Sequence, residues 1–242
     1  MGGNRMNTLN VLWLAWPWIG FGGGIVIAIQ LFCTNHFRST LNRPRYSDTT
    51  WLSWLMVLAY LIHVCEEYAL HITDGQFYLI DTFVSMGMSE RFGNIPLWFF
   101  PYINIVMTWI ALPIAAVLSK KNPVIGLSGI GFVLINGLTH LGSCISGHTT
   151  PMASPGSVTG IFVFLPLFGY VVYICKKEKL LQKKGLGIAV ASGVIAHILL
   201  FTMYLMNKVA GHIAAAIYIP IVCFSPIIIS SLLCKKFKIA FE

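Results

Sequence analysis

The chain has 242 residues, of which 57% belong to the apolar set and only 10% are charged, and its mean hydropathy is +0.77. This composition excludes a soluble globular protein and is typical of an integral membrane protein. The formal net charge of +8 would suit a nucleic-acid partner. The basic residues lie in the connections between apolar segments, however, so we expect the lipid bilayer and no nucleic acid as the partner.

Seven segments of the sequence are apolar enough to cross a bilayer, which takes about 20 residues per helix. In chain order they are residues 10–32, 51–72, 96–119, 122–145, 156–175, 186–206 and 212–234. The first is too long for the core of a signal peptide, so we expect it to be retained as a helix. The connections are too short for a soluble domain. The predicted fold is therefore all-α, a single seven-helix transmembrane domain over residues 1–242.

Lys and Arg residues alternate between sparse and dense along the connections. They are dense near 33–50, at 120–121, at 176–184 and in the tail at 235–238, and sparse in the other connections. Under the positive-inside rule the dense connections are cytoplasmic. This pattern predicts a multi-pass protein of the cell (cytoplasmic) membrane with its N-terminus outside and its C-terminus in the cytoplasm.

The segment LIHVCEEYALH, residues 61–71, carries two adjacent acids inside the second apolar segment. A charge at membrane depth costs about 2.5 to 3.5 kcal/mol, which makes Glu66 and Glu67 functional candidates. No Lys or Arg lies inside a predicted span, so histidines, protons or a metal cation must compensate the acids. His63 precedes Glu66 by three residues and Glu67 by four, and His71 follows Glu67 by four. These side chains therefore share one face of a helix.

The fourth apolar segment is interrupted in the same way at Asn136 and His140, which are four residues apart. With a rise of about 1.5 Å per residue, Glu67 and His140 both lie about 7 Å below the outer surface. His63 and Asn136 both lie about 13 Å below it by the same rise. We therefore expect the second and fourth helices to form one polar site in the outer half of the bundle.

Three motifs follow one another along this region: HVCEE at 63–67, NGLTH at 136–140 and SPGSVTG at 154–160, with Pro155, Gly156 and Thr159. Together they resemble the HXXEE family of multi-pass membrane proteins, which is marked by an HxxEE motif, an NxxxH motif and a Pro-Gly element. The resemblance covers the core from the second to the fifth predicted helix. It implies an enzyme, because the charged signature residues of that family have been taken to mean one, and it implies no substrate.

The residues themselves predict a metal site. His63, Glu67 and His140 would bind a divalent metal, with zinc favoured and iron as the alternative, and would leave one position open for water. Glu66 would act as general base or as a further ligand, and Asn136 would orient the substrate or stabilise an oxyanion. The alternative is a structural network in which the glutamates are protonated or hydrogen-bonded to histidines.

Five further residues are weaker candidates. His197 stands alone in the sixth predicted helix, where a packing role is the ordinary explanation, and His148 and His212 lie where they could cover the site from outside. His71 stands one turn beyond Glu67. Cys144 follows His140 by one turn, although the six cysteines lack CxxC spacing and are expected to be buried apolar residues.

The function that we expect is a metal-dependent hydrolase acting on a lipid-like or amphipathic substrate. The first alternative is a di-iron oxidase or oxygenase, since paired Glu and His residues on helices also build such centres. A second is a metal-independent glutamate peptidase similar to the CAAX-type intramembrane enzymes, although their EExxxR motif would place an arginine where His71 stands. A third is an ion or proton transporter or sensor, against which the inner halves of the helices offer few polar residues and no inverted repeat.

Overall fold

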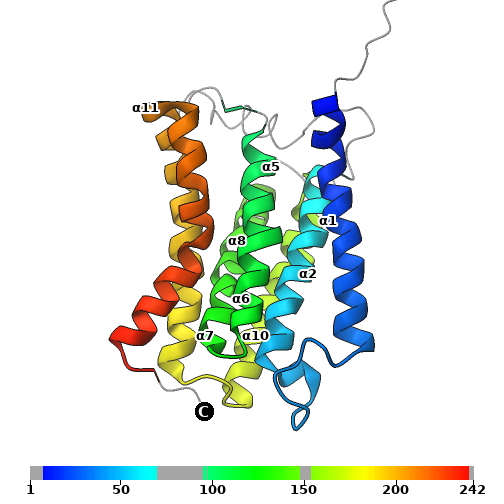
Figure 1. The fold of residues 1–242 in the computed structure, drawn as a ribbon, viewed down its shortest axis with the longest axis vertical. Coiled ribbons are helices and arrows are strands. Elements are labelled where there is room, and N and C mark those ends of the chain that lie inside the picture. Colours follow the sequence, from blue (N-terminus) through cyan, green and yellow to red (C-terminus); the bar gives the residue numbers. More distant parts are fainter. Residues whose placement is uncertain (1–7, 70–94, 97, 148–153, 240–242) are drawn as a thin grey trace, which may run out of the picture.

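The computed structural model describes residues 8–69, 95–96, 98–147 and 154–239 (Figure 1). All regular elements among these residues are helical, and six helices are long and apolar enough to cross a membrane. The all-α, multi-pass character expected from the sequence is thereby confirmed. The first two helices are α1 (Thr8–Cys33) and α2 (Thr49–Tyr68), with the short 3-10 helix η1 (Arg45–Ser47) between them.

The next three spans are composite, and α11 forms the last (Figure 1). The third and fifth each contain a π-helical stretch, which shifts the face that the following residues present. The third consists of α5 (Phe99–Asn104), the π-helix η3 (Ile105–Ala111) and α6 (Leu112–Leu118). The fourth consists of α7 (Pro123–Gly126), η4 (Leu127–Gly129) and α8 (Ile130–Ile145). The fifth consists of α9 (Ser157–Thr159), the π-helix η5 (Gly160–Phe164) and α10 (Leu165–Lys177), and the last is α11 (Lys183–Lys236).

Helix α2 lies at the centre of the bundle and α1 at its edge. Within the apolar window of each helix, 78% of α2 is buried by protein, compared with 28% of α1. Helix α2 packs against α1 and α6 and also contacts α9. The polar residues of α2 are therefore held inside protein.

The helix starts carry side-chain caps that the local sequence supplies. Asp48 accepts hydrogen bonds from the backbone N–H groups of Thr50 and Trp51 at the start of α2. Asn122 caps α7 in the same way, with Pro123 at the first helical position. Such caps satisfy the N–H groups that have no partner within the helix.

Helices α8 and α11 cross at two glycines. A β-carbon added at Gly131 would lie 2.0 Å from the carbonyl oxygen of Val190, and one at Gly193 would lie 2.6 Å from the backbone of Ser128 and of Phe132. Backbones approach this closely only where side chains are absent, which is a common device for packing helices in membranes. The crossing brings His197 of α11 to the same side of the bundle as His140 of α8.

Helix α11 is interrupted at Gly211, whose dihedral angles are φ 83° and ψ 176°. This left-handed conformation favours glycine, since other residues would be strained there. The element thus comprises two helices joined across a sharp kink. In Figure 1 the first part of α11 leads away from the end of the bundle that holds the C-terminus, and the last part returns to it.

The basic residues of the described segments gather at that same end of the bundle (Figure 1), apart from Lys208. They lie after α1, between α6 and α7, between α10 and α11, and after α11. Glu67, near the last residue of α2, lies toward the opposite end. The acidic site is therefore separated from the basic connections by most of the length of α2.

Candidate functional site

The site is built around the last turn and a half of α2. His63 is 1% exposed, and the side chain of Glu67 is 11% exposed. The two face each other one turn apart, with 3.7 Å between Nε2 of His63 and Oε2 of Glu67. This confirms that the four-residue spacing places both side chains on one face of the helix.

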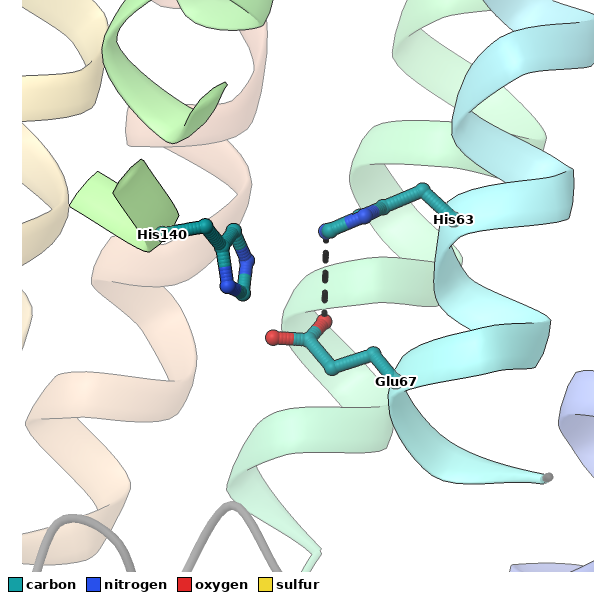
Figure 2. A group of neighbouring side chains, drawn as sticks. All are labelled: His63, Glu67 and His140. Carbon is teal, nitrogen blue, oxygen red and sulfur yellow. Dashed lines mark ion pairs between the residues drawn. The ribbon is translucent and has the colours of Figure 1, made fainter. Parts of the chain in front are cut away.

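His140 of α8 completes a group of three (Figure 2). One ligand atom from each of His63, Glu67 and His140 lies within 4.8 Å of the other two. Two atoms bound tetrahedrally to one ion at about 2.0–2.2 Å lie about 3.4 Å apart, which is close to the His63–Glu67 separation. Among the described residues this is the group of His, Cys, Asp and Glu side chains with the spacing of a metal site.

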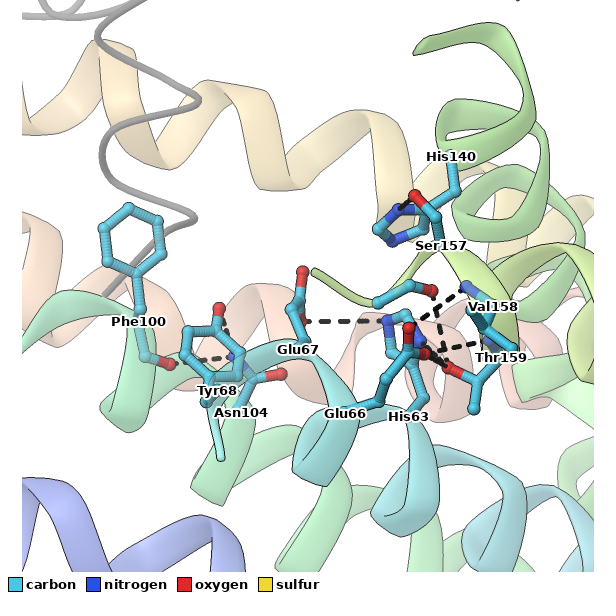
Figure 3. Close-up of polar contacts among 11 residues, drawn as sticks. His63, Glu66, Glu67, Tyr68, Phe100, Asn104, His140, Ser157, Val158 and Thr159 are labelled. Atoms are coloured by element: carbon cyan, nitrogen blue, oxygen red, sulfur yellow. Dashed lines mark hydrogen bonds and ion pairs between the residues drawn. The ribbon is translucent and has the colours of Figure 1, made fainter. Parts of the chain in front are cut away.

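Both imidazole rings form hydrogen bonds with hydroxyl groups of α9, on the side away from Glu67 (Figure 3). Nδ1 of His63 lies 2.8 Å from Oγ1 of Thr159, and Nδ1 of His140 lies 3.3 Å from Oγ of Ser157. Because each Nδ1 has a partner in α9, Nε2 is the nitrogen that each ring leaves for the site. Partners of this kind orient histidines that bind metals.

The hydrogen bonds of Thr159 determine which nitrogen of His63 carries the proton. The single hydroxyl hydrogen of Thr159 has two acceptors in reach, the carboxylate of Glu66 and, at 3.3 Å, the carbonyl of Gly156. Since both can only accept, the hydroxyl donates to one of them, and its oxygen is left to accept from Nδ1 of His63. Nε2 of His63 therefore presents a lone pair toward Glu67. That atom is buried and has no hydrogen-bond partner in the described structure.

Glu66 has a different position from Glu67, although the two are adjacent. Its Oε1 accepts from the N–H of Val158 at 3.1 Å, and its Oε2 accepts from the N–H of Thr159 at 2.8 Å and from the Thr159 hydroxyl. Glu66 thus caps the first turn of α9, where a carboxylate satisfies free N–H groups and complements the helix dipole. Both oxygens are engaged, so Glu66 supports the histidines through α9 and does not face the cavity.

The Pro-Gly element brings α9 against the two histidines. Gly156 has φ 77°, a conformation that favours glycine and starts the helix. A β-carbon at Gly156 would lie 2.9 Å from the ring of His63 and 2.9 Å from the ring of His140. A β-carbon at Gly160 would lie 2.7 Å from the His140 ring. Larger residues at either position would displace the proposed ligands.

A cavity of about 300 Å³ opens from Glu67 and His140 into the bundle. Its polar lining includes Asn136 and His197. Oδ1 of Asn136 and Nδ1 of His197 are both buried and have no hydrogen-bond partner among the described residues. Buried polar atoms are nearly always paired, so these two are placed to meet a ligand or water.

The remaining candidates are outside this group. His212 bonds to Oδ1 of Asn207 through its Nδ1 at 2.6 Å and does not line the cavity, and Cys144 is a free, half-buried thiol that is absent from the metal-type group. His71 and His148 lie outside the described residues. His197 does line the cavity, so its position is more than one of helix packing.

Sequence reasoning missed two parts of the site. Ser157 and Thr159 hold the histidine rings, although the only signal for them was the SPGSVTG segment in which they stand. Asn104 of α5 donates to the hydroxyl of Tyr68 of α2 at 3.2 Å, and both residues line the cavity.

The motifs agree with one comparison to known proteins. The model of a family described as a protein of unknown function with HXXEE motif matches residues 54–171, which include all three motifs. No curated protein and no solved structure matched the chain. Residues 54–171, which carry both histidines, both glutamates and the Pro-Gly element of the site, thus match the HXXEE family.

Proposed function

We propose that the chain is a membrane-embedded metal-dependent hydrolase, in which His63, Glu67 and His140 bind one divalent cation. The observation that carries the proposal is the lone pair of His63 Nε2, buried without a partner and 3.7 Å from a Glu67 oxygen. Two electron-rich atoms at this distance, of which the nitrogen is fully buried, need a cation or a proton between them. A cation held also by His140 meets that need for all three side chains.

Charge compensation from the chain itself is absent at this place in the described structure. The described residues that line the cavity include no Lys or Arg, and the basic residues cluster at the other end of the bundle. A divalent cation would neutralise Glu67 without any movement of the backbone. The Glu66–Thr159–His63 arrangement supports the same proposal, because it leaves Nε2 deprotonated, the form that binds metals.

Zinc is the favoured ion, since two histidines and one carboxylate with an open position form one of the ligand sets of catalytic zinc sites. When bound there, zinc would lower the pKa of a water molecule to about 7 and polarise a carbonyl group. The same ligand set also suits a single non-haem iron. Glu66 is directed at α9, so the described residues supply one three-ligand group and no second carboxylate for a di-iron centre.

Asn136 and His197 each have a buried polar atom without a hydrogen-bond partner among the described residues, which suggests a role for each in the reaction. Asn136 would orient the substrate through its unpartnered amide oxygen. His197 would move a proton during the reaction, because it lines the same cavity as His140 and its Nδ1 has no hydrogen-bond partner among the described residues. Histidine is the side chain suited to proton transfer near neutral pH. Glu66 then serves as a positioning residue instead of the general base that the sequence suggested.

The proposal includes the seven-span topology. The kink at Gly211 divides α11 into two helices, and each is long enough to span a bilayer of about 30 Å. With the basic connections in the cytoplasm, the N-terminus and the site face the outside. A shallow site in the outer half of the bilayer suits a reaction that consumes water.

The test of the metal site is the metal content of the purified protein. We expect about one zinc per wild-type chain and less than a tenth of that in Glu67→Gln and His140→Ala. His36→Asn is the control, because His36 lies in the connection after α1, far from the site, and should retain full metal. Full metal content in both site variants would show that the ligand assignment is wrong, and iron in place of zinc would favour an oxygenase.

The test of the reaction is hydrolysis in proteoliposomes. A mixture of fluorescent single-chain acyl amides and esters should be cleaved by the wild-type protein, and a chelator should abolish cleavage until zinc is returned. Cleavage that survives complete removal of metal would support the metal-independent glutamate peptidase instead. Ion flux without cleavage would support a transporter.

A further inference from the structure

The lining and volume of the cavity indicate the kind of ligand that it can hold. Away from Glu67 and His140 the lining is largely apolar, with side chains from the α5–η3 segment, α8 and α11: Phe100, Ile103, Met107, Phe132, Leu200 and Phe201. Its volume of about 300 Å³ is at the lower limit of ligand pockets. It can hold one acyl chain but not the two chains of a phospholipid.

The charge of the lining constrains the polar end of the ligand. Glu67 is the one acidic residue among the described lining residues, and no Lys or Arg accompanies it. Phosphate and carboxylate groups are ordinarily recognised by Arg or Lys. A ligand of this cavity is therefore not anionic at the end that meets Glu67, His140 and Asn136.

The two unpartnered atoms distinguish between uncharged groups. Oδ1 of Asn136 can only accept a hydrogen bond, so its partner must be a donor. An amide supplies an N–H donor next to its carbonyl, whereas an ester of the same shape supplies none. His197, which is 94% buried given its 6% exposure, lines the same cavity, and its Nδ1 has no hydrogen-bond partner among the described residues. It can exchange a proton with the nitrogen of an amide.

Two of the residues that line the cavity are also exposed. They are Thr139 and Phe201, the latter to 42%. They belong to α8 and α11, which cross at their glycines farther from the site. An amphiphile that enters from the bilayer would meet the cavity at these two exposed side chains.

We propose that the cavity binds the secondary amide of a single fatty acid, with the acyl chain among the apolar residues and the N–H at Asn136. Resting on the proposed function, the reaction is hydrolysis of that amide. The carbon–nitrogen bond breaks, and a bond forms between the carbonyl carbon and the oxygen of water. One proton of water passes through Nδ1 of His197 to the leaving nitrogen, and the products are a fatty acid and an amine.

The binding part is tested apart from catalysis by photolabelling in phosphatidylcholine nanodiscs. The probe is N-ethyl decanamide with a diazirine near the end of its chain, and the competitors are N-ethyl decanamide, ethyl decanoate and decanoate. Labelling in the presence of excess phospholipid is expected in the wild-type protein. The ester should compete about tenfold less well than the amide, because it leaves the Asn136 acceptor unpaired. Decanoate should compete less well still, and equal competition by all three would overturn the proposal.

Two pairs of variants locate the binding site. Asn136→Leu should bind the amide about tenfold less well and no longer distinguish it from the ester, whereas Leu138→Ala, on the lipid-facing side of α8, should behave as wild type. Leu200→Trp should fill the cavity and reduce labelling at least tenfold. Ile198→Trp, two residues away and 58% exposed, is its control. Unchanged labelling in both cavity variants would place the probe elsewhere.

The Glu67→Gln variant separates amide binding from metal binding. Glu67→Gln should lack metal and hydrolysis yet retain the preference for amide over ester. If Leu200→Trp fails to fold, Phe201→Ala replaces it, and the enlarged cavity should shift the preference toward longer chains. Binding with that preference but without metal in the wild-type protein would refute the hydrolase and leave the ligand class standing. If the protein contains metal but its chelator-sensitive cleavage is limited to esters, the proposed hydrolase stands and the amide is refuted as the ligand class.

Discussion

Two buried carboxylates at opposite ends of α2 have opposite surroundings. Asp48, before the first turn, accepts five hydrogen bonds: its Oδ1 from the N–H groups of Thr50 and Trp51, and its Oδ2 from the backbone N–H and the hydroxyl of Ser39 and the backbone N–H of Thr40. Glu67, in the last turn, lines the cavity and lies 3.7 Å from the Nε2 of His63, an atom without a hydrogen-bond partner in the described structure. Asp48 therefore stabilises the start of α2, whereas Glu67 remains able to bind a ligand.

The comparison shows how a buried acid reveals its role. A carboxylate that serves structure has its oxygens saturated by N–H and O–H donors, as Asp48 and Glu66 have. A carboxylate that serves a ligand keeps an oxygen directed into a cavity, as Glu67 does. If this difference is functional, substitutions at the two ends of α2 should have separable effects on metal binding, the reaction and stability.

Cation binding should stabilise the protein through the site that contains Glu67 and not through Asp48. At a free zinc concentration a thousand times the dissociation constant, the wild-type protein should gain about 4 kcal/mol of stability. Glu67→Gln should gain none, whereas Asp48→Asn should gain as much as the wild type. Thermal unfolding in nanodiscs, with zinc titrated, measures all three. An equal gain in Glu67→Gln would erase the contrast between the two carboxylates.

Removing Asn136 should impair the reaction without affecting the metal. In Asn136→Leu we expect kcat/KM for a cleaved amide to fall about 10²-fold, since a small misplacement of the substrate has an effect of that size. Zinc content should stay at the wild-type level, as should that of the Leu138→Ala control. Steady-state kinetics beside elemental analysis measure this, and loss of zinc would instead make Asn136 part of the ligand set.

Removing the Thr159 hydroxyl should weaken metal binding while all three ligands remain. Thr159→Val eliminates the acceptor that keeps the His63 proton on Nδ1, and such outer partners typically change metal affinity 10- to 100-fold. Thr159→Ser restores the hydroxyl and should restore affinity. Competition with a chromophoric zinc chelator reports the affinity. If serine and valine behave alike, the hydroxyl does not determine the tautomer.

Removing the charge of Asp48 should have the smallest effect, and only on stability. Asp48→Asn keeps the shape of the cap but weakens its charge-assisted hydrogen bonds, so we expect a loss of about 1 kcal/mol. Zinc content and hydrolysis per folded molecule should be unchanged. A reduction in zinc per folded chain would mean that the two ends of α2 are coupled.

Most of the elements were predictable because they depend on short-range properties of the chain. The hydropathy of each segment locates the spans, and the four-residue spacing predicted that His63 and Glu67 would meet. The match in depth between the second and fourth segments correctly predicted that His140 would join them. The π-helices η3 and η5 were not predicted, since their hydrogen-bond register depends on packing with neighbouring helices.

The sequence near Glu66 and Glu67 could not predict which of the two faces the cavity. Adjacent residues on a helix point about 100° apart, and His63 is within reach of both by spacing alone. Which acid faces the cavity is decided by α9, a segment about 90 positions later in the chain, which donates three hydrogen bonds to Glu66 and none to Glu67.

By itself, the sequence determined that this chain is helical, lies in a membrane and concentrates its buried charge on one face of its second span, because hydropathy and helical periodicity act over a few residues. Only the tertiary structure decided that α9 would cap Glu66, fix the proton of His63 and leave Glu67 facing a mostly apolar cavity. Those outcomes depend on contacts between segments that are distant in the chain, and the close approach of backbones at glycines makes such contacts possible.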